Sequence, residues 1–395
     1  MKGPNDPSGI LDAMAGAGRR LVLVATGGGT RVISDLCGIP GASRVVLEGL
    51  VPYARDSVDR LLGGPQEQYC DRRIARRLAV AAWQRAAAVA TPESAIGAAV
   101  TASLVTLEPK RGAHRVHAAV QTASATHAAT VELVKGARTR SQEEAVAAEL
   151  MLALLAVACG HGLAAGSAGP ECFEGLGLRE EERVVRESFE PPVAWQRLFT
   201  GAESVVPAVP APGDEAAKPG AGCVVFPGSF DPLHEGHRLM ARIAGEIAEA
   251  SVSFELSITN VDKPTLDFQE IRDRLTLFEP SAAVWLTRAA TFVEKTSLFP
   301  RAVFVMGADT YRRLGDPRYH GGSKESAAVA VDRIASAIEG LIVFGRVAGG
   351  RFEDASRIDA PEAIRRKAYF VSEREFRMDV SSTEIRRKAT GCGTP

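Results

Sequence analysis

Short apolar runs alternate with amphipathic stretches through the second half of the chain. Strand-like runs cover residues 223–227, 252–258, 283–287, 302–307 and 341–346. A helix is expected from residue 234, because Leu239, Ile243 and Ile247 fall on one face at helical spacing. Strands that alternate with helices predict an α/β fold with a doubly wound parallel sheet. In such a sheet, ligands bind beyond the carboxyl ends of the strands.

The first half of the chain has a different pattern. Strand-like runs cover residues 21–26, 97–106, 114–123 and 126–134. The first of them ends in a GGGT turn, and the other three follow one another without a helix between them. Long helices are expected over 71–90 and 141–159. Runs of strands bracketed by helices predict a separate mixed α/β layer.

Length and composition favour two domains. A chain of 395 residues is too long for one ordinary hydrophobic core. Residues 201–222 are rich in Pro, Ala and Gly and have no apolar period, which is typical of a linker. We therefore expect one domain over 1–165, a connecting segment over 166–220 and a second domain over 221–395.

Charge and cysteine usage narrow the class of protein. The formal net charge of −1 argues against a general role on nucleic acid or on an anionic membrane. The six cysteines include no CxxC pair, which indicates free thiols in a reducing compartment. The longest apolar helix, around 150–159, is too short to span a bilayer, and no targeting segment is evident. These features predict a soluble, cytoplasmic protein.

The stretch GSFDPLHEGH follows the first strand of the second half. His234 and His237 stand three residues apart at the start of a helix, where free N–H groups and the helix dipole favour anions. Gly228 allows close approach of a phosphate, and Ser229 adds a hydroxyl group. Imidazole donors directed there would stabilise charge on a phosphate. The alternatives are a metal pair, which lacks a third ligand at suitable spacing, and two solvated surface histidines.

A second anion site is predicted near the end of the chain, in DVSSTEIRRK. Ser381, Ser382 and Thr383 precede a predicted helix, and Arg386 lies one turn into it. The alternative is an ordinary capping box on an exposed basic helix. Two further polar positions follow strands: Asp309 in GAD, and Lys263 in TNVDKPT. A carboxylate can accept hydrogen bonds from ribose hydroxyls, and a lysine can reach a phosphate.

Together these motifs resemble the nucleotidylyltransferase superfamily. GSFDPLHEGH is similar to its signature GxFDPxHxGH, VSSTEIR is similar to SSTxxR, and GAD is similar to a third mark of the nicotinamide and nicotinate mononucleotide adenylyltransferases. The resemblance covers residues 221–395. It implies direct transfer of AMP from ATP, with Mg²⁺, to a phosphorylated acceptor. The implied contacts to the triphosphate and its ribose are His234, His237, Arg386, Gly228, Ser229, Phe230, Gly307, Asp309, Ser381, Ser382 and Thr383.

The acceptor is less well defined by the sequence. The resemblance implies nicotinamide or nicotinate mononucleotide, with Lys263 at its phosphate and the rings of Trp285 and Phe292 at its base; Phe268 is a further candidate. Each ring could equally belong to the core. The stretch TFVEKTSLFP departs from the SYT-like stretch of bacterial relatives. The alternatives are a pantetheine-phosphate or cytidylyl-type transferase and, in another class, a non-catalytic nucleotide-binding scaffold or regulator. We expect a homo-oligomer and no resident metal.

The first domain resembles the CinA C-terminal domain, which in bacteria is a nicotinamide mononucleotide amidohydrolase. The resemblance rests on IPGASRVVLEGLVPYARDSVDRLLG and on the closing helix after KGARTRSQEEA. The family's serine and lysine positions hold Val24 and Val58, whereas its tyrosine is kept as Tyr53. Valine cannot donate, accept or ionise, so we expect a non-catalytic domain. Thr26 or Thr30 could replace the serine if the alignment is shifted.

Overall fold

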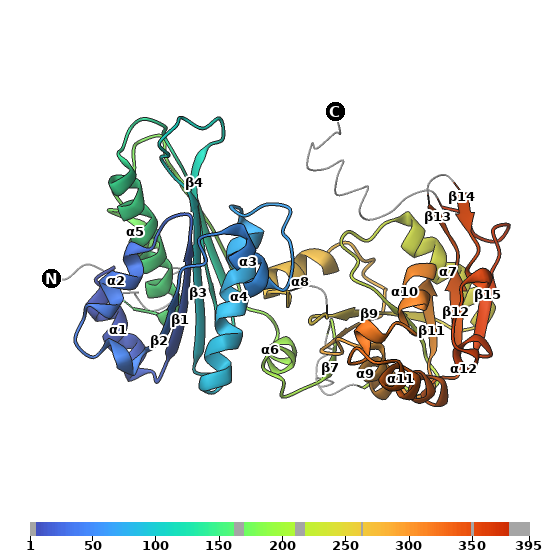
Figure 1. Ribbon diagram of the computed structural model, residues 1–395. Helices are drawn as coiled ribbons and strands as arrows, with labels where there is room; N and C mark the ends of the chain where they lie inside the picture. The colour runs from blue at the N-terminus through green and yellow to red at the C-terminus, as the bar shows by residue number, and fades with distance from the viewer. Residues whose placement is uncertain (1–4, 162–169, 210–217, 262–263, 349–350, 379–395) are drawn as a thin grey trace. The chain divides into compact units, whose positions relative to one another are not determined.

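The chain forms two units, each built around its own sheet (Figure 1). The computed structural model describes residues 5–161, 170–209, 218–261, 264–348 and 351–378. Unit 1 consists of Met1–Pro191 and Asp262–Glu270, and unit 2 of Pro192–Val261 and Ile271–Pro395. The last of the three boundaries between them therefore lies within helix α8 (Phe268–Leu275).

A six-stranded mixed sheet forms the centre of unit 1, in the order β2-β1-β3-β4-β5-β6. Its strands are β1 (Arg20–Thr26), β2 (Val46–Leu50), β3 (Ala95–Ser103), β4 (His114–Gln121), β5 (Thr126–Leu133) and β6 (Val184–Phe189). β1 is parallel to β2 and β3, and the pairs from β3 to β6 are antiparallel. The expected mixed α/β layer is confirmed.

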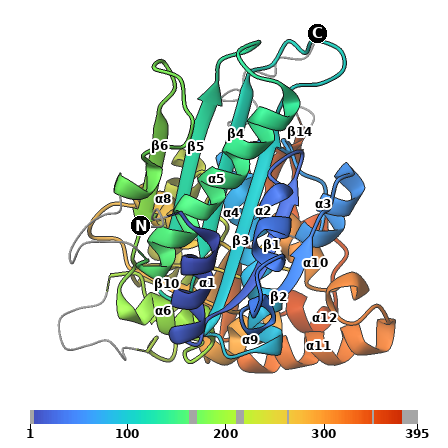
Figure 2. The same ribbon diagram turned by 90° about the vertical axis from the view of Figure 1, so that its left-hand side faces the viewer.

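Helices cover both faces of this sheet: α4 lies on one face, and α1, α2 and α5 on the other (Figure 2). The helices of unit 1 are α1 (Pro7–Gly16), α2 (Arg31–Cys37), α3 (Arg55–Leu62), α4 (Arg72–Val89) and α5 (Arg140–Cys159). Side-chain capping explains where the two long helices, α4 and α5, begin. Asp71 accepts the Ile74 N–H ahead of α4 at 2.7 Å, and Thr139 and Gln142 form a capping box ahead of α5.

Unit 2 contains a seven-stranded sheet in the order β15-β12-β11-β8-β9-β10-β7. Its strands are β7 (Val205–Pro207), β8 (Val224–Pro227), β9 (Val252–Ser257), β10 (Val284–Thr287), β11 (Val303–Gly307), β12 (Gly340–Phe344) and β15 (Ala368–Val371). All neighbours are parallel except the edge strand β7. The chain runs outward from β8 to β10 and then returns to β11 on the other side of β8. The predicted doubly wound sheet is confirmed.

Both faces of the second sheet are buried, and its strands alternate between two clusters. Phe304 and Leu341 face one cluster, whereas the adjacent Val305 and Ile342 face the other. The predicted apolar face of α7, with Leu239 and Ile243, packs against the second cluster. The helices of unit 2 are α6 (Val193–Thr200), α7 (Glu235–Ala248), the end of α8, α9 (Phe292–Leu298), α10 (Ala308–Arg313), α11 (Lys324–Ala337) and α12 (Glu362–Arg365).

The boundaries of the units differ from the expected 1–165, 166–220 and 221–395. Strand β6 lies in the expected connecting segment and pairs with β5, while α6 and β7 belong to unit 2. The apparent linker was misleading because β7 has only three residues and includes a proline, which an edge strand tolerates. β6 was missed because half-exposed charged residues interrupt its apolar pattern.

Residues 264–270 pack within unit 1 through a buried ion pair. The Arg76 Nε donates to the Asp267 carboxylate at 3.1 Å, and both side chains are almost fully buried. The Phe268 N–H donates to the Thr126 hydroxyl at 3.2 Å. Phe268, a candidate for stacking on an acceptor base, is itself fully buried in this unit. Its ring therefore belongs to the core.

Buried histidines make unit 1 sensitive to acid. Burial lowers the pKa of His127 to about 4, and its Nδ1 lies 2.9 Å from the Ser188 hydroxyl. A histidine whose folded pKa lies below its unfolded value of about 6.5 takes up its proton preferentially in the unfolded chain as pH falls. The contribution of His127 to stability is therefore complete above pH 6.5 and is lost as pH falls towards 4. We expect His127 alone to remove on the order of 2 kcal/mol between pH 7 and 5.

The comparison of wild type with His127→Asn tests this. Asparagine does not titrate, so the urea midpoint of the variant should fall less between pH 7 and 5 than that of wild type, whatever its absolute stability. Equal pH slopes for the two proteins would contradict the assignment.

Candidate functional site

The turn after β8 occupies the point where the strand order of the second sheet reverses. β8 lies between β9 and β11, which are reached by connections running in opposite directions. Ligands of doubly wound sheets bind in the crevice formed at such a point. The GSFDPLHEGH stretch begins here, because Gly228 directly follows β8 and α7 starts at Glu235. The sequence therefore places its main motif at the expected ligand site.

The ring of Phe230 leaves no room for a side chain at position 228, so glycine is required there. A Cβ at this position would lie 2.6 Å from the ring of Phe230, and the Gly228 N–H already donates to the Glu255 carbonyl at 3.0 Å. Contact of Gly228 with a nucleotide would therefore be through its Cα. Phe230, expected to line the nucleotide, is 1% exposed and packs among Phe226, Phe254 and Phe278. Its side chain is core, and only its backbone could face a ligand.

The two histidines lie together at the start of α7. Their rings stack with centroids 3.8 Å apart and an interplanar angle of 26°. Burial, and then the neighbouring His234, lower the pKa of His237 to about 3, and burial also lowers the pKa of His234. The His234 N–H donates to His237 Nδ1 at 3.3 Å, which assigns the ring proton of His237 to Nε2. At neutral pH the pair offers neutral N–H donors.

Asp309 is engaged by arginines at the carboxyl ends of β11 and β12. Its carboxylate accepts from Arg312 at 3.4 Å and from Arg346, and these two arginines also contact Glu353. A ribose at Asp309 would therefore share or displace these contacts. Gly307 precedes α10, and apart from its chain neighbours no described residue has an atom within 4 Å of the place where its Cβ would be. This leaves room for a ligand above Gly307.

The aromatic candidates for the acceptor base both pack against the core. Trp285 lies in β10 and is partly buried, and the ring of Phe292 lies 4.9 Å from that of Phe304. Packing accounts for both rings, and stacking on a base stays a prediction. Five predicted site residues lie outside the described part of the chain: Lys263, Ser381, Ser382, Thr383 and Arg386.

Arg274 was not predicted from the sequence, although it contacts the main turn. Its Nη1 donates to the Ser229 carbonyl at 2.7 Å, and its Nη2 lies 3.6 Å from the Asp231 carboxylate. The side chain is 7% exposed. Nothing in FQEIRDRLTLF distinguishes this arginine from the exposed Arg272 beside it, because both fall in one polar helix.

The N-terminal unit holds valines at the two positions where the resemblance implies a serine and a lysine. Val24 and Val58 are buried, while Tyr53 is 66% exposed. The possible substitutes are both hydrogen-bonded: Thr26 donates to the Pro52 carbonyl at 2.8 Å, and Thr30 to the Glu144 carboxylate at 2.9 Å.

The Glu144 carboxylate also accepts hydrogen bonds from the backbone at the GGGT turn. Burial acts to raise its pKa, but hydrogen bonds from the Gly29 backbone, the Thr30 hydroxyl and the Arg31 N–H lower it overall. The carboxylate is therefore ionised at neutral pH and occupies the place where a phosphate would need these donors. It lies in a hollow of about 610 Å³ lined by Gly28, Thr30, Arg31, Ser34, Tyr53, Arg140, Ser141 and Glu144.

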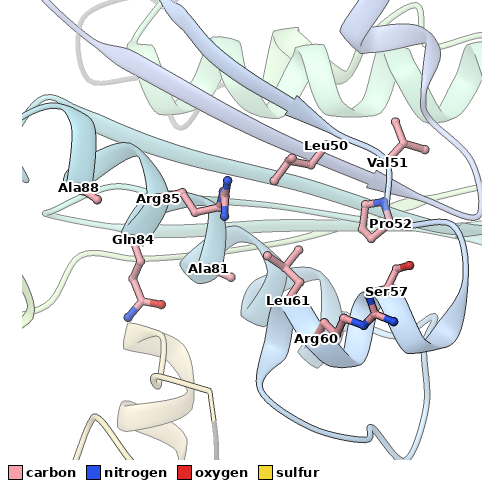
Figure 3. Close-up of a pocket in the computed structure, with 10 residues that line it drawn as sticks. All are labelled: Leu50, Val51, Pro52, Ser57, Arg60, Leu61, Ala81, Gln84, Arg85 and Ala88. Carbon is pink, nitrogen blue, oxygen red and sulfur yellow. The ribbon is translucent and has the colours of Figure 1, made fainter.

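A second hollow in unit 1, of about 680 Å³, lies between the end of β2, α3 and α4 (Figure 3). Leu50, Leu61 and Ala81 supply apolar lining, and Arg60 and Arg85 line it with charge. Arg85 is paired with Glu48 through two hydrogen bonds, of 2.7 and 3.0 Å. The hollow is open to solvent and is lined by both apolar and charged side chains, and none of the predicted site residues lines it.

Comparison with known protein families gives a match to the C-terminal part of the chain. Residues 225–388 match a family model described as cytidylyltransferase-like. No curated protein matches the chain. The C-terminal part is therefore similar to cytidylyltransferase-like domains, which supports a nucleotidyl transfer activity.

Solved structures similar to this chain include CinA-type proteins, which match its N-terminal part. They include a competence or damage-inducible protein from Enterobacter asburiae, with 16% identity over 40% of this chain and 99% of that chain, at a TM-score of 0.34. A CinA superfamily protein from Escherichia coli has 18% identity over 37% and 88%, at 0.30. The protein from Agrobacterium tumefaciens has 19% identity over 41% and 98%, at 0.31.

Two features are absent from the described residues. None of their helices is both long and apolar enough to cross a bilayer. They also contain no group of three or more His, Cys, Asp or Glu side chains arranged to hold a metal ion.

We predict that the N-terminal unit does not hydrolyse the amide of nicotinamide mononucleotide. Its matching positions are valines, and Thr30 is held by a carboxylate whose lowered pKa makes it a weak base. The test uses the full chain, since a fragment ending at residue 165 would remove β6 from the sheet. Ammonia should not rise above the blank. Sustained release that disappears in Thr30→Ala would show a working nucleophile.

Proposed function

We propose that the C-terminal unit transfers AMP from ATP to a phosphorylated acceptor, foremost nicotinamide or nicotinate mononucleotide, and releases pyrophosphate. The observation that supports this most directly is the stacked pair His234 and His237 at the start of α7, directly behind the β8 turn. The match of residues 225–388 to a cytidylyltransferase-like family agrees with the class of reaction. The resemblance of the C-terminal motifs supports the choice of acceptor.

The reaction requires positioning and charge stabilisation. An oxygen of the acceptor phosphate attacks the α-phosphorus of the nucleotide in line, the bond from the α-phosphorus to the bridging oxygen breaks, and pyrophosphate leaves. Negative charge grows on the departing oxygens. The His237 Nε2–H would donate to them as a neutral group, and Arg386, through its motif, would add a cation. Neither side chain forms a covalent bond to the substrate.

Mg²⁺ fits this scheme as a partner of the nucleotide. The described residues supply no set of metal ligands. Mg²⁺ is commonly held by substrate phosphates with only one or two protein carboxylates. It would therefore arrive with ATP and neutralise phosphate charge.

The identity of both substrates is tested by one screen. Purified protein is incubated with ATP or CTP and with nicotinate mononucleotide, nicotinamide mononucleotide, phosphopantetheine or a phosphorylated sugar alcohol, and pyrophosphate is measured. We expect release with ATP and a pyridine mononucleotide. Release with CTP instead would favour the cytidylyl alternative, which the family description makes the second candidate. No release with any pair, despite nucleotide binding, would support a non-catalytic scaffold.

His237→Asn and His237→Gln should differ in turnover. The amide nitrogen of glutamine can approach the place of imidazole Nε2, whereas that of asparagine lies near Nδ1. Since Nε2 carries the donor proton, we expect His237→Gln to keep more activity. We expect His237→Ala to lose about 10²–10³ in kcat, with a smaller change in ATP binding.

Arg242→Ala provides the control for these variants, because Arg242 lies on the same helix with its side chain 67% exposed. It should behave as wild type. Turnover of His237→Ala within threefold of wild type would exclude this histidine from the chemistry.

A further inference from the structure

The Ser229–Phe230 peptide lies at the centre of the turn, and its orientation is set from outside the turn. Its carbonyl, that of Ser229, accepts from Arg274 Nη1 at 2.7 Å. In a trans peptide the carbonyl and the following N–H point in opposite directions. The Phe230 N–H therefore points away from Arg274. It donates to no described residue.

The backbone conformation at Phe230 is strained, so the orientation of the preceding peptide needs support from its surroundings. Its φ of 42° lies in the left-handed region, where a bulky side chain is strained. Aromatic packing fixes the ring, with Phe278 at 5.3 Å and His237 at 5.2 Å between centroids. Packing fixes where the side chain lies but leaves the peptide free to turn about the bonds beside it. The hydrogen bond from Arg274 removes that freedom.

Arg274 is also anchored on the other side of the turn. Its Nη2 lies 3.6 Å from the Asp231 carboxylate, so one guanidinium contacts both residues that flank Phe230. The side chain is 7% exposed, and a buried guanidinium with two such contacts has little freedom to reorient. A lysine would offer a single point charge and could not reproduce this fork.

We propose that Arg274 is a positioning residue for the nucleotide site: it orients the Ser229–Phe230 peptide so that the Phe230 N–H is available to a nucleotide phosphate. This inference rests on the proposed function and assigns no contact between Arg274 and the substrate. The Phe230 N–H then acts beside His237 as a second neutral donor, one supplied by the backbone.

The experiment compares Arg274→Lys and Arg274→Ala with Arg272→Ala in the full chain. Arg272 lies on the same helix, is 40% exposed and contacts the neighbouring Asp273, so its loss should leave kcat within about twofold of wild type. We expect Arg274→Lys to lower kcat by about 10- to 100-fold, the loss typical of a misplaced donor, with KM for the nucleotide changing less. Thermal unfolding of each variant verifies that the fold is retained.

Chemical rescue separates positioning from a merely structural role. Guanidinium at roughly 10–50 mM is far below the concentrations that unfold proteins. At this concentration it should restore part of the activity of Arg274→Ala, whereas ammonium should not. It should not restore His237→Ala. Equal kcat in Arg274→Lys and wild type, or losses that follow the unfolding temperature with no rescue, would overturn the proposal.

Failure of the proposed reaction is distinguishable from failure of this inference. If wild type releases no pyrophosphate with any acceptor, Arg274 is judged by binding of ATP. Affinity at least tenfold weaker in Arg274→Lys, and unchanged in Arg272→Ala, would support a role in orienting a phosphate donor. Unchanged affinity in both variants would refute it.

Discussion

The constraint on which the C-terminal site depends is the close packing of Phe230 against Gly228. A Cβ on Gly228 would lie only 2.6 Å from the ring of Phe230. The backbone of Phe230 adopts a left-handed conformation that brings the ring to this position. Such a conformation persists only where the surroundings enforce it. Phe226, Phe254 and Phe278 supply that enforcement from the core. Core packing therefore fixes the ring of Phe230 and the course of the turn, and the hydrogen bond from Arg274 fixes the Ser229–Phe230 peptide within it.

The electrostatic character of the site follows from burial. The imidazoles of His234 and His237 are too buried and too close together to be charged at neutral pH. The described arginines nearby already have carboxylate partners, Arg274 with Asp231 and Arg346 with Asp309. This part of the site thus offers neutral donors with defined directions and little free positive charge. The triphosphate that we propose as ligand needs both, so cations would have to come from Mg²⁺ and from the predicted site residue Arg386.

The sequence predicted the fold of unit 2 well, because strands buried on both faces and amphipathic helices give strong patterns. It also predicted the pair at α7, since the two histidines lie within one motif. It could not predict Arg274, which meets the turn only after a strand and a helix have been placed between them. It likewise missed the arginine partners of Asp309, because Arg346 lies on a separate hairpin, β13 (Arg346–Ala348) and β14 (Arg351–Glu353). Edge strands β6 and β7 were missed because edges need no continuous apolar run.

Both units contain the same kind of turn, but its backbone N–H groups have different partners in the two units. Each has a glycine-bearing turn between a buried first strand and a helix, which is a common way to present backbone N–H groups to an anion. In unit 1 the donors at Gly29, Thr30 and Arg31 are taken by the chain's own carboxylate, Glu144. In unit 2 the Phe230 N–H has no described partner, and the one nearby carboxylate, Asp231, is held by Arg274. A turn of this kind becomes a ligand site only where the protein keeps its own anions away from it, and by that criterion the C-terminal turn qualifies and the N-terminal one does not.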